Sequence, residues 1–462
     1  MNILLSSVCY NESIFQYKMS RLFRKEGFSV TLLTFSKKGY KEIKNSLKND
    51  EIKIFYIEHL LKSPLKKVGK ELNIEIINLE KTYNTNLRSI YKSDLVYNKR
   101  QKRNEKELIK LTIKYFHVIK DFLRKNKINF IFSGNGGELI RRVSIKVAKK
   151  QKIPYITNYF VPTGGVALVN NELYDLEIDM ETKEQIPKKE RKNILKYINK
   201  IRNAKISFLN DRNIKIDKKR FLTFFKLMKK TLKQERDPEQ LPPFEQIKNK
   251  IGILIRKHVE RLYYEKFDKN KNYIFFPLHY TDDAQITVRA PLFSNQLSLI
   301  EMISKSLPYG YSLYVRGHPN NLGFNPLSLY KKINKLSNVR LISPYIPPHE
   351  VIKNSKAMIV INSTAGYEGI IFQKPVIALG DSFYWKNGLT FDVKEINNLP
   401  IMISKAVNSP KINQESIIQF IYKLRKISYK GKSMSADYSN KNVAELTNSV
   451  LKKIEGLTSQ NG

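Results

Sequence analysis

The chain is 462 residues long and 41% hydrophobic, which favours two domains of about 200 residues each over a single core. Its 83 Lys and Arg residues outnumber 42 Asp and Glu residues, and the formal net charge of +41 indicates either an anionic partner or a basic surface without a dedicated partner. The single cysteine, Cys9, excludes an internal disulfide, and no run approaches the roughly 18 apolar residues of a membrane-spanning helix.

The first 35 residues predict a strand, a helix and a second strand. NILLSSVCY is a short apolar run, residues 13–25 have helical spacing, and FSVTLLTF is the next apolar run. Gly27 lies between them, where a helix commonly ends. An α/β domain therefore begins at once, and we place it at residues 1–175.

Residues 128–142 are the most informative part of this first domain. A strand at Ile128–Phe132 leads through SGNGG into a helix that begins near Glu138. Gly136 and Gly137, which follow Asn135, let the backbone approach a ligand, and Glu138 projects a carboxylate from the helix start. The simpler alternative is that Glu138 only adds favourable charge to the first turn. IPYITNYF then predicts a strand, and VPTGGVALVNNELYD predicts a loop with glycines.

Residues 176–270 are predicted to form a basic helical connecting region. Residues 211–270 contain 17 Lys and Arg against 9 Asp and Glu, and two segments place apolar residues beside basic ones with helical spacing. We favour a helical bundle between domains. A membrane-surface element is the alternative.

Residues 271–400 show the alternation of strands and helices that is typical of a doubly wound parallel sheet. Helical patterns at Ser294–Ser306 and Pro348–Ser355 separate short apolar runs. These runs are Tyr273–Pro277, Ser312–Val315, Arg340–Ile342, Met358–Ile361 and Pro375–Leu379. The remainder, 401–462, is predicted to be helical and to pack across both domains.

Polar residues follow three of these runs, and ligands of such sheets bind beyond the carboxyl ends of the strands. Ser363 and Thr364 open a helix, where free N–H groups and partial positive charge favour phosphate, although plain capping is the alternative. His318 adds a donor that can become cationic, and Glu368 is positioned to accept from ribose hydroxyls. The candidate residues are His279, Asp283, Gln285, Arg316, His318, Ser363, Thr364 and Glu368.

The strings FFPLHYTDDAQI, RGHP, INSTAGYEG and KPVIALG resemble the bacterial capsule polysaccharide biosynthesis proteins, a family that includes transferases of 3-deoxy-manno-octulosonic acid (Kdo). The resemblance implies an α/β protein of the GT-B type, with two Rossmann-like doubly wound domains facing a cleft. The donor nucleotide is then held mainly by the second domain, and Asn135, Gly136 and Gly137 lie on the acceptor side. The pairs His318-Pro319 and Ser363-Thr364 are also similar to those of sialyltransferases that use CMP-sugars.

One departure affects the catalytic base. Those sialyltransferases usually carry two acidic residues before a glycine, and GNGGE is only a loose substitute. Glu138 and Asp283 are therefore both candidates for the base, and His318 is the candidate that stabilises the leaving phosphate.

The expected activity is transfer of Kdo or another acidic sugar from a CMP donor to a surface polysaccharide or its lipid-linked precursor. No metal or other cofactor is expected. Besides the nucleotide sugar and the glycan or glycolipid acceptor, an anionic membrane surface and capsule assembly proteins are candidate partners, whereas nucleic acid is not. We expect a cytoplasmic protein, with a peripheral position at the inner face of the plasma membrane left open. A CDP-polyol phosphotransferase of the teichoic acid type, a nucleotide-sugar epimerase and a non-catalytic polyanion-binding protein are the alternatives.

Overall fold

The structure is a computed structural model, and it describes residues 1–47, 52–62, 72–173, 176, 178–203, 241–434 and 436–459. The chain divides into two compact units. Unit 1 comprises Met1–Tyr174, Gln234–Pro243 and Ile427–Gly462, and unit 2 comprises Asp175–Lys233 and Phe244–Lys426. The basic stretch that the sequence places before Leu241 lies almost wholly outside the described residues.

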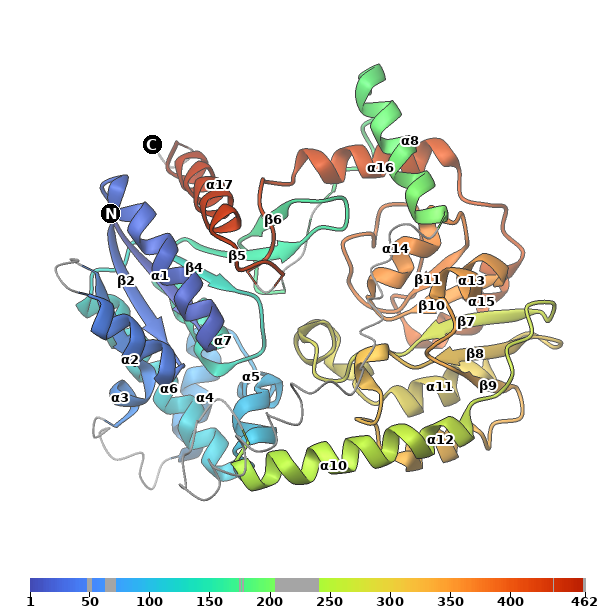
Figure 1. Cartoon of the computed structure of the whole chain (residues 1–462), viewed down its shortest axis with the longest axis horizontal. Coiled ribbons are helices and arrows are strands. Elements are labelled where there is room, and N and C mark those ends of the chain that lie inside the picture. The colour runs from blue at the N-terminus through green and yellow to red at the C-terminus, as the bar shows by residue number, and fades with distance from the viewer. Residues whose placement is uncertain are drawn as a thin grey trace, which may run out of the picture. The chain divides into compact units, whose positions relative to one another are not determined.

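Unit 1 is built on a sheet whose strands occur in the order β3-β2-β1-β4-β5-β6 among the described residues (Figure 1). All neighbouring pairs are parallel except β5 and β6. The strands are β1 (Asn2–Ser7), β2 (Ser29–Thr34), β3 (Lys53–Tyr56), β4 (Phe130–Gly134), β5 (Tyr155–Phe160) and β6 (Val166–Val169). The helices are α1 (Tyr10–Lys25), α2 (Lys37–Ser46), α3 (Ile57–Leu61), α4 (Leu72–Tyr83), α5 (Leu87–Ser93), α6 (Glu105–Lys125), α7 (Leu139–Lys150) and α17 (Asn440–Ser459).

Unit 2 repeats this plan with parallel strands in the order β12-β11-β10-β7-β8-β9. The strands are β7 (Tyr273–Pro277), β8 (Ser312–Arg316), β9 (Val339–Ile342), β10 (Ala357–Val360), β11 (Val376–Ala378) and β12 (Phe391–Asp392). The helices are α8 (Lys188–Arg202), α10 (Pro243–Val259, in this unit from Phe244), α11 (Gln296–Lys305), α12 (Leu327–Ile333), α13 (Pro348–Asn354), α14 (Thr364–Ile371), α15 (Leu399–Val407) and α16 (Gln414–Lys426).

Both sheets have the strand order of a Rossmann-like doubly wound fold, with the first strand of each unit at the centre. Their central strands are almost entirely buried, as expected for parallel strands covered on both faces. The predicted α/β fold class is therefore confirmed. In each unit the order reverses beside the first strand, between β1 and β4 and between β7 and β10, and this topology defines where ligands of such sheets bind.

One detail differs from the sequence analysis. The segment predicted as a loop after β5 contains strand β6, which pairs antiparallel with β5 and has Val166 opposite Phe160. Of the C-terminal helices, α15 and α16 lie in unit 2 and α17 lies against α1 in unit 1. Within the described ranges, no helix is long and apolar enough to cross a membrane.

Candidate functional site

The switch point of unit 2 brings together side chains from segments that are far apart in the sequence. His279 follows β7, and its Nε2 accepts a hydrogen bond from the backbone N–H of Asn362, which follows β10, at 3.5 Å. The Asn362 amide group donates to the carbonyl oxygen of Gln285 at 2.8 Å. The structure thus joins the predicted residues His279 and Gln285, which follow β7, to the end of β10 across the reversal in strand order.

Helix α14 begins at this edge with an unusual N-cap. Ser363 has the extended backbone of an N-cap residue, but its hydroxyl makes no capping hydrogen bond. The Ser363 Oγ is buried without a hydrogen-bond partner, as is the Asn362 Oδ1 beside it. Ser382 Oγ and Trp385 Nε1, which lie in the loop after β11, are also buried and without partners. Buried polar atoms are normally paired, so this set indicates polar groups that a ligand would satisfy.

The loop after β11 fixes the start of α14. The Tyr384 hydroxyl donates to the carbonyl oxygen of Ser363 at 2.6 Å. Gly366 leaves room for that hydroxyl, because a Cβ at position 366 would lie 2.4 Å from it. By contrast, a Cβ at Gly317 would meet only Pro344 Cβ at 3.9 Å, so the expected close backbone approach at that glycine is not crowded by protein atoms.

The two predicted imidazoles lie near one another at the ends of β7 and β8. Burial, and secondarily the charge of His318, lowers the pKa of His279 to about 3. Burial, and secondarily the charge of Arg316, lowers the pKa of His318 to about 4. Both rings are therefore neutral at neutral pH in the absence of a ligand. A neutral His279 agrees with its Nε2 accepting the Asn362 N–H.

Two other predicted residues, Arg316 and Glu368, have protein partners. Arg316 is 1% exposed, and its guanidinium donates to the carbonyl oxygens of Ile346 at 3.0 Å and Pro344 at 2.6 Å. Glu368 is fully buried, with Oε1 3.2 Å from the Nε2 of His349. These contacts hold the loop after β9 and helix α13 in place, and the proposed ligand roles of Arg316 and Glu368 stay predictions.

Asp283 and Thr364 lie at the rim of the same edge. The Asp283 carboxylate accepts from the backbone N–H of Gln285 at 3.0 Å, which caps the π-helical turn Gln285–Arg289. Desolvation by the atoms that surround the carboxyl group raises the pKa of Asp283. The residue as a whole is exposed to solvent, so water reduces the size of this shift. Thr364 is the first residue of α14 and is half-buried.

Arg289 belongs to this edge and was not singled out from the sequence. It is 7% exposed, and its Nη1 donates to the side-chain oxygen of Gln285 at 3.2 Å. A buried guanidinium next to unpartnered polar atoms suits an anion. In the sequence, Arg289 is an arginine twelve residues after Pro277, the last residue of β7. That position alone does not distinguish it from the other arginines.

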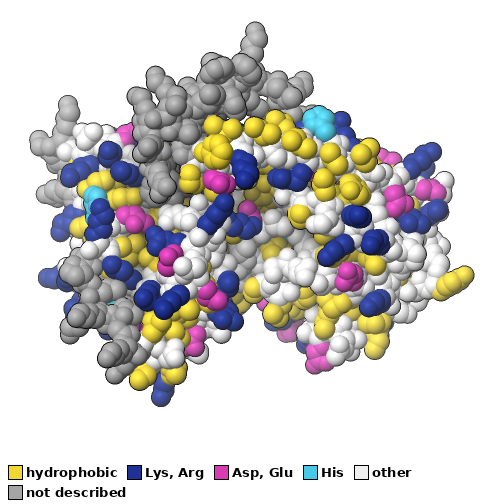
Figure 2. All heavy atoms as spheres, turned by 90° about the horizontal axis from the view of Figure 1, so that it is seen from below, with side chains coloured by type: hydrophobic (Ala, Val, Ile, Leu, Met, Phe, Trp, Pro, Cys, Tyr) yellow, Lys and Arg dark blue, Asp and Glu magenta, His cyan; other side chains and the backbone are white. Residues whose placement is uncertain are grey.

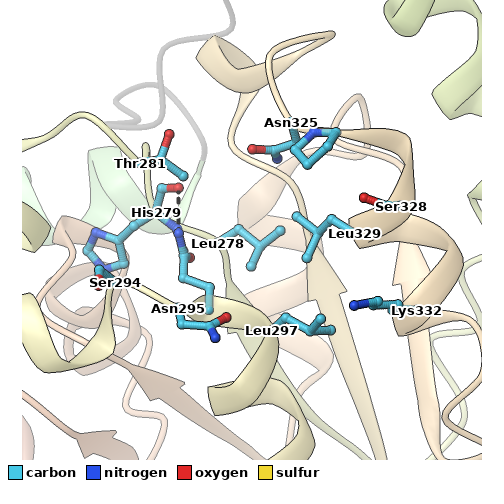
Figure 3. Close-up of a pocket in the computed structure, with 12 residues that line it drawn as sticks. Leu278, His279, Thr281, Ser294, Asn295, Leu297, Asn325, Ser328, Leu329 and Lys332 are labelled. Atoms are coloured by element: carbon cyan, nitrogen blue, oxygen red, sulfur yellow. Dashed lines mark hydrogen bonds between the residues drawn. The ribbon is translucent and has the colours of Figure 1, made fainter. Parts of the chain in front are cut away.

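A pocket of about 250 Å³ adjoins His279 on its other side (Figure 3). Leu278, Leu297 and Leu329 form its apolar floor, while Thr281 and Asn325 lie at its rim. Lys332 projects toward it from α12. The pocket offers an apolar surface with a few polar groups, which is the usual character of a small-ligand site.

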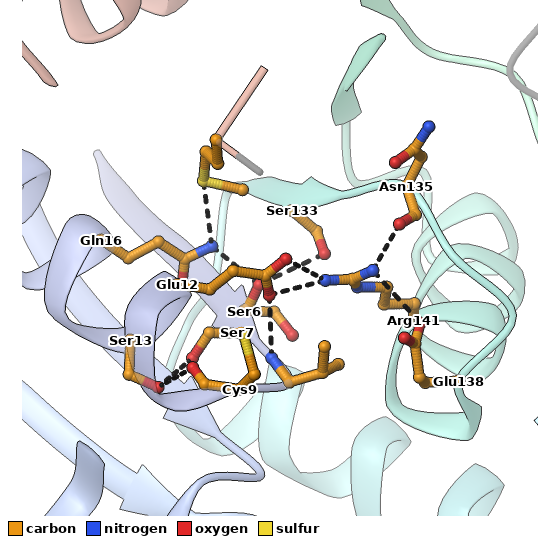
Figure 4. A network of polar contacts seen from close by, with 12 residues as sticks. Ser6, Ser7, Cys9, Glu12, Ser13, Gln16, Ser133, Asn135, Glu138 and Arg141 are labelled. Carbon is orange, nitrogen blue, oxygen red and sulfur yellow. Dashed lines mark hydrogen bonds and ion pairs between the residues drawn. The ribbon is translucent and has the colours of Figure 1, made fainter. Parts of the chain in front are cut away.

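The switch point of unit 1 holds a second polar cluster (Figure 4). Its centre is Arg141, which is 4% exposed on α7. The Nη2 atom donates to both carboxylate oxygens of Glu12 at 2.8 and 2.6 Å, and Nη1 donates to the carbonyl oxygen of Asn135 and lies 3.2 Å from Glu138 Oε2. One guanidinium therefore faces two carboxylates, and it fixes the position of Glu138.

The two glycines before α7 lie close to neighbouring atoms, which are side chains at Gly136 and backbone at Gly137. A Cβ at Gly136 would lie 2.1 Å from Glu138 Oε2, and a Cβ at Gly137 would lie 2.4 Å from the carbonyl oxygen of Ser93. Asp94, which the sequence did not indicate, accepts from the backbone N–H of Leu139 at 2.7 Å and so caps α7 in place of Glu138. Burial raises the pKa of Asp94 to about 7. No group of three or more His, Cys, Asp or Glu side chains suited to a metal ion occurs in the part of the chain that the structure describes.

Comparison with known proteins shows which family this part of the chain resembles. The sequence model of the capsule polysaccharide biosynthesis proteins matches residues 233–420, a range that includes every site residue of unit 2 named above. The resemblance found in the motifs is thereby confirmed for this part of the chain.

Individual relatives cover shorter stretches. The capsule polysaccharide export protein KpsS of Escherichia coli is 32% identical over 94 residues, which is 19% of this chain and 24% of KpsS. The capsule polysaccharide modification protein LipB of Neisseria meningitidis is 27% identical over 148 residues, which is 30% of this chain and 33% of LipB. The matches thus span a third or less of the relatives' own length.

Among solved structures, the beta Kdo 2,4 transferase KpsC of Thermosulfurimonas dismutans aligns with a TM-score of 0.36 and 13% identity, over 64% of this chain and 79% of that chain. A score this low does not establish a common fold, so the fold class rests on the strand order of the two sheets.

Proposed function

We propose that this chain is a glycosyltransferase of capsule polysaccharide biosynthesis that uses a CMP-linked acidic sugar such as Kdo as its donor. The observation that carries the proposal is the pair of buried, unpartnered polar atoms of Asn362 and Ser363 at the start of α14. The match of residues 233–420 to the capsule family supports the reaction class, and the name of KpsC motivates Kdo as the sugar to test first.

In this proposal the start of α14 binds the phosphate of the donor. The Ser363 hydroxyl and the N-terminal N–H groups donate to the phosphate oxygens, and the partial positive charge of the helix end favours the anion. Arg289 supplies the full positive charge close by. His318 is neutral when no ligand is bound, and the single N–H of its neutral ring donates a hydrogen bond to the phosphate. The negative charge of the phosphate then favours the protonated form of the ring.

The transfer itself forms a bond between an acceptor hydroxyl oxygen and the anomeric carbon and breaks the bond between that carbon and the CMP oxygen. The electron pair of the broken bond leaves with CMP, whose growing negative charge is stabilised by Ser363, His318 and the helix end. The acceptor proton passes to a carboxylate. Asp283 in unit 2 and Glu138 in unit 1 are the candidates, and Arg141 holds Glu138 in one orientation.

The experiment that tests this proposal compares the melting temperature of the protein with CMP, CDP, UDP and GDP. A ligand at about 100 times its dissociation constant adds about 2.7 kcal/mol to the stability, which corresponds to a rise of several degrees. We expect the largest rise with CMP. The Ser363→Ala variant should lose most of it, because one buried donor to the phosphate is gone.

Ser306→Ala is the matched control, since this serine also lies at a helix end but its hydroxyl bonds to the Met302 carbonyl away from the site. A response to CDP alone would favour the polyol-phosphate transferase, and a response to UDP alone would favour an epimerase or another donor. If no nucleotide changes the melting temperature, or if both serine variants respond alike, the proposed site is wrong.

A further inference from the structure

Helix α10 and the turn after it carry a row of apolar side chains that face solvent. Phe244 is 64% exposed, Ile251 48%, Ile255 59% and Leu262 83%. Phe244, Ile251 and Ile255 are separated by seven and four residues, which places them on one face of α10, and Leu262 lies in the 3-10 turn that follows the helix. The row runs the length of α10, about 26 Å at 1.5 Å per residue.

The opposite side of α10 is anchored to unit 2. Arg256 donates to the carbonyl oxygen of Gly323 at 2.7 Å, and a Cβ at Gly323 would lie 2.2 Å from the carbonyl oxygen of Ile253. The fully buried Glu260 accepts from the Gly323 N–H at 3.0 Å. The helix is therefore fixed on its inner side, and its outer apolar row is a stable feature of the surface.

The cations beside this row are Lys248, which is exposed on the same face, and Arg261, which is exposed in the turn that follows the helix. The acidic side chains of α10 and its turn lie elsewhere: Glu245 is half-buried a quarter-turn away, and Glu260 is buried. Figure 2 shows hydrophobic side chains gathered in a row with Lys and Arg side chains beside them and a histidine at one end.

We propose that this face of α10 docks onto an anionic lipid bilayer. An apolar row flanked by cations is the pattern of a helix that lies in the membrane interface, where the apolar side chains enter the acyl boundary and the cations meet lipid phosphates. The net charge of +41 adds a long-range attraction to such a surface. The same charges oppose the face of a second copy of this chain, because Lys248 and Arg261 would meet like charges.

This inference does not depend on sugar transfer, and its test measures lipid binding alone. The full-length protein is sedimented with phosphatidylcholine vesicles that contain or lack phosphatidylglycerol, at low and high salt. We expect binding only to the anionic vesicles, and we expect salt to weaken it, since screening acts within about 8 Å at physiological ionic strength. Ile255→Glu and Leu262→Glu should each weaken binding about tenfold or more, because each withdraws an aliphatic side chain and adds a repelled charge.

Ile401→Glu is the matched control. Ile401 lies on α15 and is 54% exposed, close to the 59% of Ile255, but it is outside the row. Unchanged vesicle binding in this variant supports the proposal. Equal weakening by Ile255→Glu and Ile401→Glu, or equal binding to neutral vesicles, would overturn it. The proposal also fails if the α10 variants convert an oligomer to a monomer, measured by analytical ultracentrifugation, without any change in vesicle binding.

Discussion

His279 and His318 are the residues whose protonation the fold changes most clearly at the candidate site. Their pKa values are lowered from the ordinary value near 6.5 to about 3 and about 4. Between pH 6.5 and about 4 the unfolded chain therefore binds protons that the folded chain does not bind. The free energy of unfolding should fall as the pH falls through this window, and the contribution is fully present above it.

We expect His279→Gln to make this decline less steep. Glutamine has a side-chain oxygen that accepts the Asn362 N–H but does not titrate, so one of the two protonation sites is removed. Denaturant unfolding at a series of pH values between 7 and 5 measures the slope for both proteins. A slope that is the same in the variant would show that His279 titrates normally in the folded chain.

Sequence reasoning found residues whose role depends on being at a strand end. His279, Gln285 and Ser363 lie at strand ends that the apolar runs locate directly, and the topology then brings these segments together. Arg289 and Trp385 could not be found in this way. The relevance of Arg289 comes from its burial beside Gln285, and that of Trp385 from a buried indole N–H without a hydrogen-bond partner, and both features exist only after distant segments have packed.

At the scale of elements, the start of α14 depends on Gly366 more than on any other glycine of the site. An alanine there would place its Cβ 2.4 Å from the Tyr384 hydroxyl and 2.7 Å from Tyr384 Cζ, within a buried contact. We expect Gly366→Ala to lower the free energy of unfolding by about 1–3 kcal/mol, the range seen for an overpacked core. It should also break the hydrogen bond from Tyr384 to Ser363.

Gly317→Ala is the comparison for this prediction, because the added Cβ would have only Pro344 within reach, at 3.9 Å. Its effect on the free energy of unfolding should stay within about 0.5 kcal/mol, as is usual for a substitution without a named conflict. Denaturant unfolding of both variants measures the difference. If Gly317→Ala proves the more damaging of the two, the described packing of the loop after β11 is incorrect.

The central strands of unit 2 were predicted well, and so was its edge strand β9, whereas the edge strand β6 of unit 1 was missed. β7, β8 and β10 are apolar runs with clear breakers, and the predicted and observed bounds differ by no more than one residue at either end. β6 lies at the edge of its sheet. The sequence Thr-Gly-Gly comes directly before it, and these turn-forming residues led to the prediction of a loop. Its existence depends on pairing with β5, a contact that the local sequence does not reveal.

For the whole molecule, the main organising feature is that the chain leaves unit 1 and returns to it. Residues Ile427–Gly462 belong to unit 1, although the preceding helix α16 belongs to unit 2. Leu446 and Val450 of α17 are fully buried in one cluster with Phe15 and Met19 of α1. The last helix thus completes the core that begins with the first helix. Helical periodicity predicts that α17 has an apolar face, but it cannot show which domain that face packs against.

This division predicts that a cavity in α17 weakens one unit and spares the other. Leu446→Ala should lower the stability of unit 1 by about 2–5 kcal/mol, the cost of removing a buried leucine side chain. If unit 2 binds the nucleotide as proposed, the dissociation constant for CMP should stay within about twofold, since substitutions without shared contacts act independently. Differential scanning calorimetry with and without CMP measures both effects.

Leu299→Ala is the matched substitution in unit 2, where Leu299 of α11 is 1% exposed in the other core cluster. Multi-domain chains commonly unfold in more than one step, so each variant should move a different transition. CMP should raise only the transition that Leu299→Ala lowers, because ligand binding stabilises the unit that contains the site. A single transition that both variants lower equally would show that the two units unfold together, and the separate cores would then not act as independent units of stability.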